Sequence, residues 1–203
     1  MVDLSQLNLN DAPVETSHEI EVDLACVVVA NHGYALEGIG RAEEKDIANV
    51  RQVLEGEDWD LVSSEIRHAE TFYEDLRRSA NRLAVVGLVT RLQHWISLFI
   101  KRAKIGKLPQ TYRSKLLNQL EALNELLRTE IVAVSFFNEL VDVRDSVVHA
   151  NSQAEWEYPA GNKRQITQRY RSAWSDVEFG PEQLKEAVAK TVQQVKWYDE
   201  NIH

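Results

Sequence analysis

"RLAVVGLVTRLQHWISLFI", residues 82–100, is apolar almost all the way round a helix. A surface helix is apolar on one face only, so a helix with this pattern is expected at the centre of a bundle. Residues 58–106, which contain the stretch, predict one or two long helices that end at Gly106 and Pro109. The stretch therefore predicts an all-α fold with this segment in its core.

Helical periodicity extends to both sides of this segment. Upstream, a helix is expected from Ser17 to about Arg41, weakened or broken by its glycines, followed by a short amphipathic helix over 42–56. Downstream, residues 111–127 carry leucines at helical spacing, and residues 129–150 predict a last bundle helix that ends near Asn151. The expected core is thus a bundle of several helices.

The pattern changes after this bundle. Residues 154–158 and 163–171 flank "PAGN", which predicts a β-hairpin, and residues 175–179 are expected to add a third short strand. Gly180 and Pro181 then open a closing helix. The predicted organisation is a flexible lead-in over 1–16, a helical bundle over 17–152, and a β-hairpin appendage with a closing helix over 153–203.

The amino-acid composition restricts the class of protein that this chain can be. The 203 residues are 44% hydrophobic and 27% charged, values typical of one globular domain. The single Cys26 cannot form an internal disulfide and is expected to be a small buried apolar residue. The first residues are polar and acidic, and no uninterrupted run of about 18 apolar residues occurs. These features predict a soluble, cytoplasmic protein without a membrane segment.

Charge is distributed unevenly. The net charge is −9, but residues 1–75 hold 18 acidic and 4 basic side chains, whereas residues 76–203 hold 14 acidic and 19 basic ones. Residues 76–120 contain no carboxylate and ten basic residues: Arg77, Arg78, Arg82, Arg91, Lys101, Arg102, Lys104, Lys107, Arg113 and Lys115. Such a segment either faces the phosphates of a nucleic acid or pairs with the acidic first half of the chain.

"VDVRDSVVHANSQ", residues 141–153, places an arginine on an apolar helix face. With Phe137 as reference, Arg144 falls roughly 20° away, inside the stripe formed by Phe137, Val141 and Val148. An arginine stays charged and needs a partner, unless its long side chain reaches solvent at the helix end. Asp145 and His149 lie one turn apart at the edge of this stripe, where the carboxylate can fix the histidine tautomer. We expect this face to be a cleft or a subunit interface.

Arg144, the polar Asp145 and His149, on the last helix of a compact bundle, resemble the signature of the HEPN family (higher eukaryotes and prokaryotes nucleotide-binding). The resemblance covers roughly residues 20–151 and includes the apolar helix before the motif. Asp145 stands where the family more usually has Asn. The resemblance implies a HEPN-like helical bundle and a metal-independent ribonuclease without cofactor, often a toxin in a toxin–antitoxin or antiviral defence system. It also implies a homodimer in which both motifs face one cleft, although some members are inactive binding modules.

From these residues we predict catalytic roles for Arg144, Asp145 and His149. The histidine would move protons and the arginine would hold the charge of the phosphorane. RNA affinity is expected from the basic segment, at Arg77, Arg82, Lys101, Arg102 and Lys104. RNA, a second copy of the chain and a cognate antitoxin protein are the expected partners. The alternative is a catalytically inactive HEPN-like module that binds protein or nucleotide.

Two further patterns in the sequence have the residue types of a binding site. The pairs Glu15/His18 and Glu65/His68 have ligand spacing, but a di-metal bundle also needs carboxylates from other core helices, so no metal site is predicted. Aromatic and basic residues alternate in the appendage and predict either a packed hairpin or a surface that stacks on single-stranded RNA. These residues are Trp156, Tyr158, Tyr170 and Trp174, with Lys163, Arg164, Arg169 and Arg171.

Overall fold

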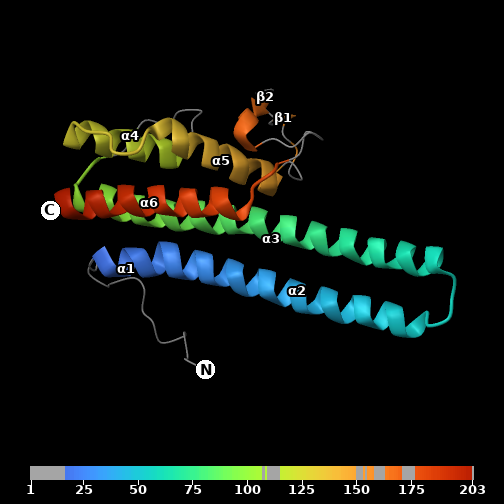
Figure 1. The fold of residues 1–203 in the computed structure, drawn as a ribbon. Helices are drawn as coiled ribbons and strands as arrows, with labels where there is room; N and C mark the ends of the chain where they lie inside the picture. Colours follow the sequence, from blue (N-terminus) through green and yellow to red (C-terminus); the bar gives the residue numbers. More distant parts are fainter. Residues whose placement is uncertain are drawn as a thin grey trace.

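The computed structural model describes residues 17–106, 108, 115–149, 153, 155–157, 163–170 and 177–202. The predicted lead-in, residues 1–16, lies outside this part of the chain. The described chain is mostly helical, as the apolar segment 82–100 predicted (Figure 1). Its helices are α1 (Ser17–Glu21), the π-helix η2 (Val22–Val27), α2 (Val28–Val53), α3 (Trp59–Arg102), α4 (Lys115–Leu127), α5 (Val134–His149), the 3-10 helix η3 (Gln168–Tyr170) and α6 (Pro181–Asn201).

The expected break in the first long helix was wrong. α2 runs without interruption through Gly33, Gly38 and Gly40 up to Val53, and the chain turns only at Gly56, which has a φ of +89°. Each helical glycine costs about 1 kcal/mol relative to alanine but does not by itself break a helix. Packing against α3 along the length of α2 offsets this cost, because tertiary contacts supply most of the stability of a helix in a protein.

α3 is one helix of 44 residues, not two. Asp58 caps its first turn, with a side-chain oxygen that accepts a 2.7 Å hydrogen bond from the backbone N–H of Asp60. The second half of α3 is the centre of the core, where Leu88, Ile96 and Phe99 are at most 1% exposed. Ile20 and Leu24, from the first turns of the chain, pack into the same core.

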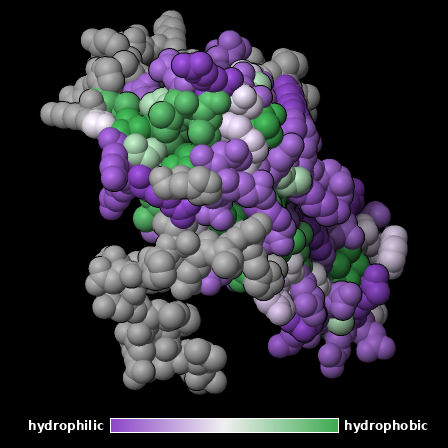
Figure 2. Space-filling model, turned by 90° about the vertical axis from the view of Figure 1, so that its left-hand side faces the viewer, coloured by the Kyte–Doolittle hydropathy of each residue, from purple (hydrophilic) through white to green (hydrophobic). Residues whose placement is uncertain are grey.

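The other helices surround this half of α3. α6 lies beside it, between the α1–α2 layer and the α4–α5 layer (Figure 1). Arg102 of α3 donates to Asp199 of α6 over 3.0 Å, and Lys196 of α6 lies 2.6 Å from Glu21 of α1. Figure 2, which looks onto the bundle end opposite the α2–α3 turn, shows apolar side chains gathered in its upper part among hydrophilic ones. The closing helix is therefore a central part of the bundle.

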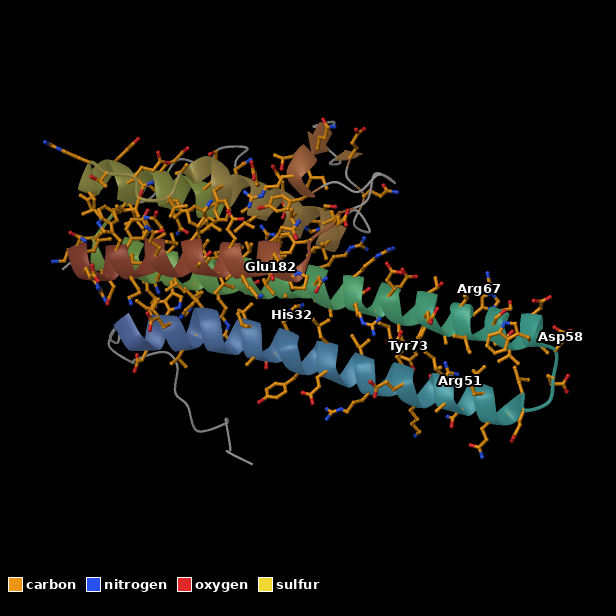
Figure 3. The ribbon with its side chains drawn as sticks, in the orientation of Figure 1. His32, Arg51, Asp58, Arg67, Tyr73 and Glu182 are labelled. Atoms are coloured by element: carbon orange, nitrogen blue, oxygen red, sulfur yellow. The ribbon has the colours of Figure 1, made fainter. Side chains whose placement is uncertain are left out.

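The far halves of α2 and α3 extend well past the other helices (Figure 1). We call residues 35–83 the arm. Its two helices are joined side by side by a hydrogen bond from the Tyr73 hydroxyl to Asp46 and by an ion pair between Arg77 and Glu43. At the base of the arm, His32 Nε2 lies 2.6 Å from Asn81 Oδ1. Figure 3 shows Tyr73 and His32 directed into the space between the two helices.

The segment after α5 contains two three-residue strands. β1 (Glu155–Glu157) pairs antiparallel with β2 (Lys163–Gln165), with Trp156 opposite Arg164. Among the described residues the sheet has only these two strands. Of the third strand expected at 175–179, Val177 forms a single bridge, and residues 175 and 176 lie outside the described part of the chain. Ile166, Tyr170, Val177 and Phe179 belong to the same hydrophobic core as the helices. The described residues of this segment therefore pack on the bundle.

α3 also contains one stretch long and apolar enough to cross a membrane, with 39% of that stretch buried in the structure. A core helix of a bundle has the same composition. Here Leu88, Leu92 and Ile96 of this helix are buried against other helices. The apolar character of α3 is thus accounted for by packing inside the bundle.

Candidate functional site

The predicted site lies at the end of α5. This helix begins at Val134, five residues later than predicted, where a Glu130 carboxylate oxygen accepts a 2.6 Å hydrogen bond from the Val134 backbone N–H. Leu140 and Val143 are buried against the rest of the bundle. The helix is therefore anchored along its length by the core, and it presents its last turn at the surface.

The predicted apolar stripe is divided between core and surface. Phe137 and Val141 are 1% and 3% exposed, because they pack inside the single chain. Val148, in the last turn, is 52% exposed. A second copy is not needed to bury Phe137 and Val141, so a subunit contact on this stripe would be confined to the last turn of α5.

Arg144 has an ionic partner within its own helix. Its Nε lies 2.7 Å from Oδ1 of Asp145, and the two side chains are 24% and 15% exposed. The Nε atom is shielded from solvent, but its N–H is not directed at that oxygen and makes no hydrogen bond with any described residue. The interaction is therefore an ion pair without a hydrogen bond through Nε. Arg144 therefore has the ionic partner that a charged side chain on an apolar face needs, and that partner is the neighbouring carboxylate.

His149 is the last residue of α5 and is exposed to solvent. It follows Asp145 by one helical turn, so both lie on the same edge of the helix. The end of α5 is held in place by Ser146, whose hydroxyl donates a 2.6 Å hydrogen bond to the carbonyl oxygen of Gln153. The structure thus brings Arg144 and Asp145 into contact and leaves the His149 ring accessible to a ligand.

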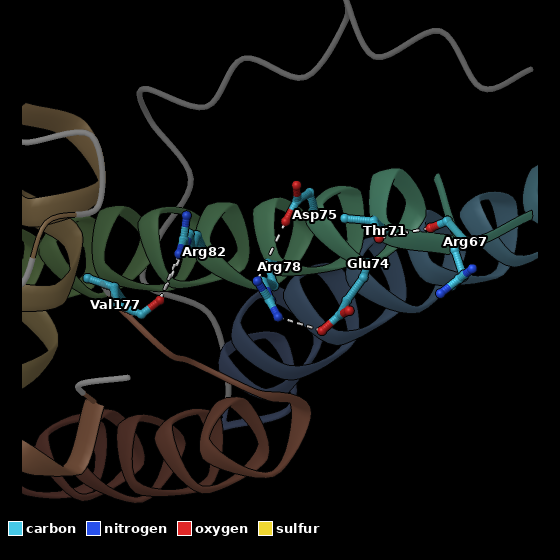
Figure 4. A network of polar contacts seen from close by, with 7 residues as sticks. All are labelled: Arg67, Thr71, Glu74, Asp75, Arg78, Arg82 and Val177. Carbon is cyan, nitrogen blue, oxygen red and sulfur yellow. Dashed lines mark hydrogen bonds and ion pairs between the residues drawn. The ribbon is translucent and has the colours of Figure 1, made fainter. Parts of the chain in front are cut away.

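Three of the five predicted RNA-binding residues are engaged inside the chain. Arg77 pairs with Glu43, and Arg102 pairs with Asp199. Arg82 donates to the carbonyl oxygen of Val177 at 3.2 Å through Nε and 3.0 Å through a terminal nitrogen (Figure 4). These three arginines hold elements of the fold together. Only Arg77 pairs with the acidic first half of the chain, as the pairing alternative expected, because Asp199 and Val177 lie in the second part.

The other two basic residues of this set are surface groups. Lys101 and Lys104 are both exposed at the end of α3, and Lys104 adopts a left-handed backbone conformation with a φ of 53°. Arg78, also exposed, pairs with Glu74 and lies 3.6 Å from Asp75 within its own helix (Figure 4). Lys101 and Lys104 are therefore the predicted RNA-binding residues best placed to meet a phosphate.

A charged network that sequence reasoning missed lies between η3 and α6. Arg169 pairs with Glu186, which also lies 3.0 Å from Lys190. The hydrogen bond from Lys190 is the main cause that lowers the pKa of Glu186, and Lys190 also sits 4.3 Å from the centre of the Phe136 ring. Burial raises the pKa of the neighbouring Tyr170 to about 12. The network attaches the appendage to the bundle, so Tyr170 and Arg169 have a structural role.

Sequence reasoning also missed a hollow between the two helices at the base of the arm. It has a volume of about 490 Å³, and His32 and Asn31 of α2 face Ser79, Leu83 and Arg91 of α3 across it. Its other lining residues are Val28 and Ala35 of α2 and Leu76, Ala80, Ala84 and Gly87 of α3. No sequence motif marks it, because the hollow depends on how the two helices pair.

The described residues contain no group of three or more His, Cys, Asp or Glu side chains that could hold a metal ion. His68 Nδ1 lies 3.9 Å from Glu65 Oε1, as an isolated exposed pair. Glu15 and the side chain of His18 lie outside the part of the chain that the structure describes. Comparison of the chain with protein-family models, with curated proteins and with solved structures gives no match.

Proposed function

We propose that this protein is a metal-independent endoribonuclease of the HEPN type, with Arg144 and His149 acting on the RNA phosphate. The observation that carries the proposal is the arrangement at the end of α5. An arginine and a carboxylate are in contact there at 2.7 Å, and an exposed histidine follows one turn later. A permanent cation and a histidine, which can donate or accept a proton, on the last turns of one helix are suited to phosphodiester chemistry.

The proposed reaction is transfer of the phosphodiester to the neighbouring hydroxyl. The 2′-oxygen attacks phosphorus while a base removes its proton, and the 5′-oxygen leaves as an acid protonates it. The products are a 2′,3′-cyclic phosphate and a 5′-hydroxyl. Arg144 stabilises the extra negative charge on the phosphorane oxygens. One His149 cannot be base and acid in the same step, so the proposal needs His149 from each of two chains.

RNA would be held through its phosphates by Lys101 and Lys104, at the C-terminal end of α3. Both are exposed and attract phosphate without giving up an ion pair that holds the fold. Each phosphate contact releases counterions, so affinity should fall with increasing salt. The proposed biological setting is a toxin–antitoxin or antiviral defence system, in which a cognate antitoxin protein would cover the site.

The test is an RNA degradation assay with EDTA present, comparing wild type with His149→Ala. Loss of an acid–base group costs about 10²- to 10⁴-fold in rate, so His149→Ala should be nearly inactive. His68→Ala is the matched control, since His68 is also an exposed helical histidine but lies on the arm. Equal cleavage by wild type and His149→Ala, or a requirement for a divalent metal, would overturn the proposal.

A second candidate is a HEPN-like module that binds protein or nucleotide without cleaving RNA. The observation that favours it is the Arg144–Asp145 ion pair, which neutralises the cation that catalysis requires. This candidate predicts that wild type cleaves no RNA in the assay above. It also predicts that nucleotide binding, measured by calorimetry, weakens in Arg144→Ala.

A further inference from the structure

Four large apolar side chains of α3 are left in solvent along one face of the arm. Leu61 is 45% exposed, Phe72 57%, Leu76 36% and Leu83 65%. At about 100° per residue these four positions fall within roughly 60° of one another around the helix axis. We call Leu61, Phe72, Leu76 and Leu83 the α3 seam. An apolar stripe of this kind on a helix is normally buried against another helix.

The α3 seam runs beside the hollow at the base of the arm. Leu76 and Leu83 belong to the seam and also line the hollow, where small residues such as Ala35, Ala80 and Gly87 leave space. Beyond Leu83, Gly87 and Thr90 continue the same face of α3 and are also exposed. This face of α3 is therefore exposed from Leu61 up to the part of α3 that the other helices surround.

The seam is symmetric about Phe72. Leu61 lies eleven residues before Phe72, and Leu83 lies eleven residues after it. If a second α3 lies antiparallel to the first on a twofold axis through Phe72, Leu61 of each chain faces Leu83 of the other. The same rotation places Phe72 against its own copy. The seam is thus complementary to itself, which is what a twofold interface requires.

The charges on α3 follow the same symmetry. Residues 59–66, the first turns of α3 at the tip of the arm, contain Asp60 and Glu65 and no Lys or Arg. Residues 78–85 contain Arg78 and Arg82 and no carboxylate. The rotation about Phe72 superimposes these two segments, so each acidic tip approaches the basic base of the other arm. A parallel arrangement would instead place like charges together, which is unfavourable.

We propose that a second copy of this chain docks antiparallel on the α3 seam, with its Leu61 in the hollow beside Leu83. The seam spans 22 residues, or about 33 Å at 1.5 Å per residue, and a face two helices wide is about 20 Å across. The contact is then on the order of 660 Å² per chain, close to the roughly 800 Å² of a standard interface. The two bundles lie at opposite ends of the paired arms.

The arm interface is separate from the two-chain contact that the proposed nuclease needs, because the antiparallel arms hold the ends of the two α5 helices apart. None of the α3 seam residues belongs to α5, and association can be measured without RNA. A failure of the arm interface would therefore leave the nuclease assay interpretable. A lack of cleavage would likewise leave the association measurement unaffected.

The test is sedimentation of the full chain at micromolar concentration. Wild type should sediment as an assembly twice the size of Phe72→Glu and of Phe72→Lys, with unchanged helix content, because Phe72 is exposed in the single chain. This size ratio is expected whether or not the chains also meet through the end of α5. A residue on a twofold axis meets only its own copy. An equimolar mixture of Phe72→Glu and Phe72→Lys should therefore regain the wild-type size, since the opposite charges then face each other.

Tyr34→Glu is the matched control for this experiment. Tyr34 is an exposed aromatic residue of α2 at the base of the arm that is neither in the seam nor in the hollow, so Tyr34→Glu should keep the wild-type size. Phe72→Cys provides a second measurement: under oxidation it should cross-link to a dimer, whereas wild type, whose only cysteine is Cys26, should not. A wild type no larger than Phe72→Glu would overturn the proposal.

Discussion

Tyr73 and Asp46 join the two helices of the arm, through a hydrogen bond from the Tyr73 hydroxyl to the carboxylate. The bond also raises the pKa of the Tyr73 hydroxyl, since it favours the protonated phenol. Tyr73→Phe should speed amide hydrogen exchange in the arm while changing the free energy of global unfolding little, because the core lies in the other half of α3. Tyr34→Phe removes an exposed hydroxyl from α2 at the base of the arm and should leave exchange unchanged. Uniform exchange rates in all three proteins would show that the bond does not hold the arm.

Arg102 is expected to stabilise the fold instead of binding RNA. It donates to Asp199 at 3.0 Å and to the carbonyl oxygen of Ile202 at 3.1 Å, which fixes the end of α6 on α3. Hydrogen bonds to charged groups contribute about 1.5–3 kcal/mol, so Arg102→Ala should lower the free energy of unfolding by about 2 kcal/mol. Denaturant titration of wild type and Arg102→Ala measures this difference in the free energy of unfolding. The neighbouring exposed Lys101→Ala is the control and should stay within about 0.5 kcal/mol of wild type.

Asp145→Asn should keep or raise RNA cleavage. The substitution removes a negative charge that lies 2.7 Å from Arg144 Nε, so the guanidinium is free to meet a phosphate oxygen. It also restores the residue more usual in the family that the motif resembles. The measurement is kcat/KM for RNA cleavage, together with helix content by circular dichroism. A fall in kcat/KM with the fold intact would mean that the carboxylate itself orients His149.

Stability should fall steeply above pH 10. Burial raises the pKa of Tyr170 from 10.0 to about 12, so between these values the unfolded chain loses a proton that the folded chain keeps. Each such tyrosine lowers the free energy of unfolding by about 1.4 kcal/mol per pH unit in this window. Burial of Tyr198 raises its pKa as well and adds to the effect. Tyr170→Phe should make the decline shallower in denaturant titrations at pH 9, 10 and 11. An identical decline in wild type and variant would contradict this assignment.

The apolar segment 82–100 was enough to predict an all-α fold with this helix in the core. A helix that is surrounded by other helices carries apolar residues around most of its circumference. The continuity of α2 could not be predicted, since the packing of α3 outweighs the local cost of three glycines. The arm could not be predicted from the sequence either, because the exposure of Phe72 and Leu83 depends on where the other helices end.

The site could be predicted only in part, for a related reason. The spacing of Arg144, Asp145 and His149 fixes their places on one helix, so their neighbourhood follows from the sequence. The partners of the basic segment cannot be predicted from the sequence in this way. Glu43 lies 34 positions from Arg77, and Asp199 lies 97 positions from Arg102, so only the fold reveals these pairs.

The position of α6 against α1 and α3 determines the order in which the chain can fold during its synthesis. Lys196 reaches back across 175 positions to Glu21, and the α6 side of the core around Leu88 and Phe99 stays uncovered until α6 has left the ribosome. The paired halves of α2 and α3 need only each other and a short turn, so they can assemble much earlier. A nascent chain therefore exposes part of the apolar half of α3 for as long as translation takes to travel from residue 102 to residue 201.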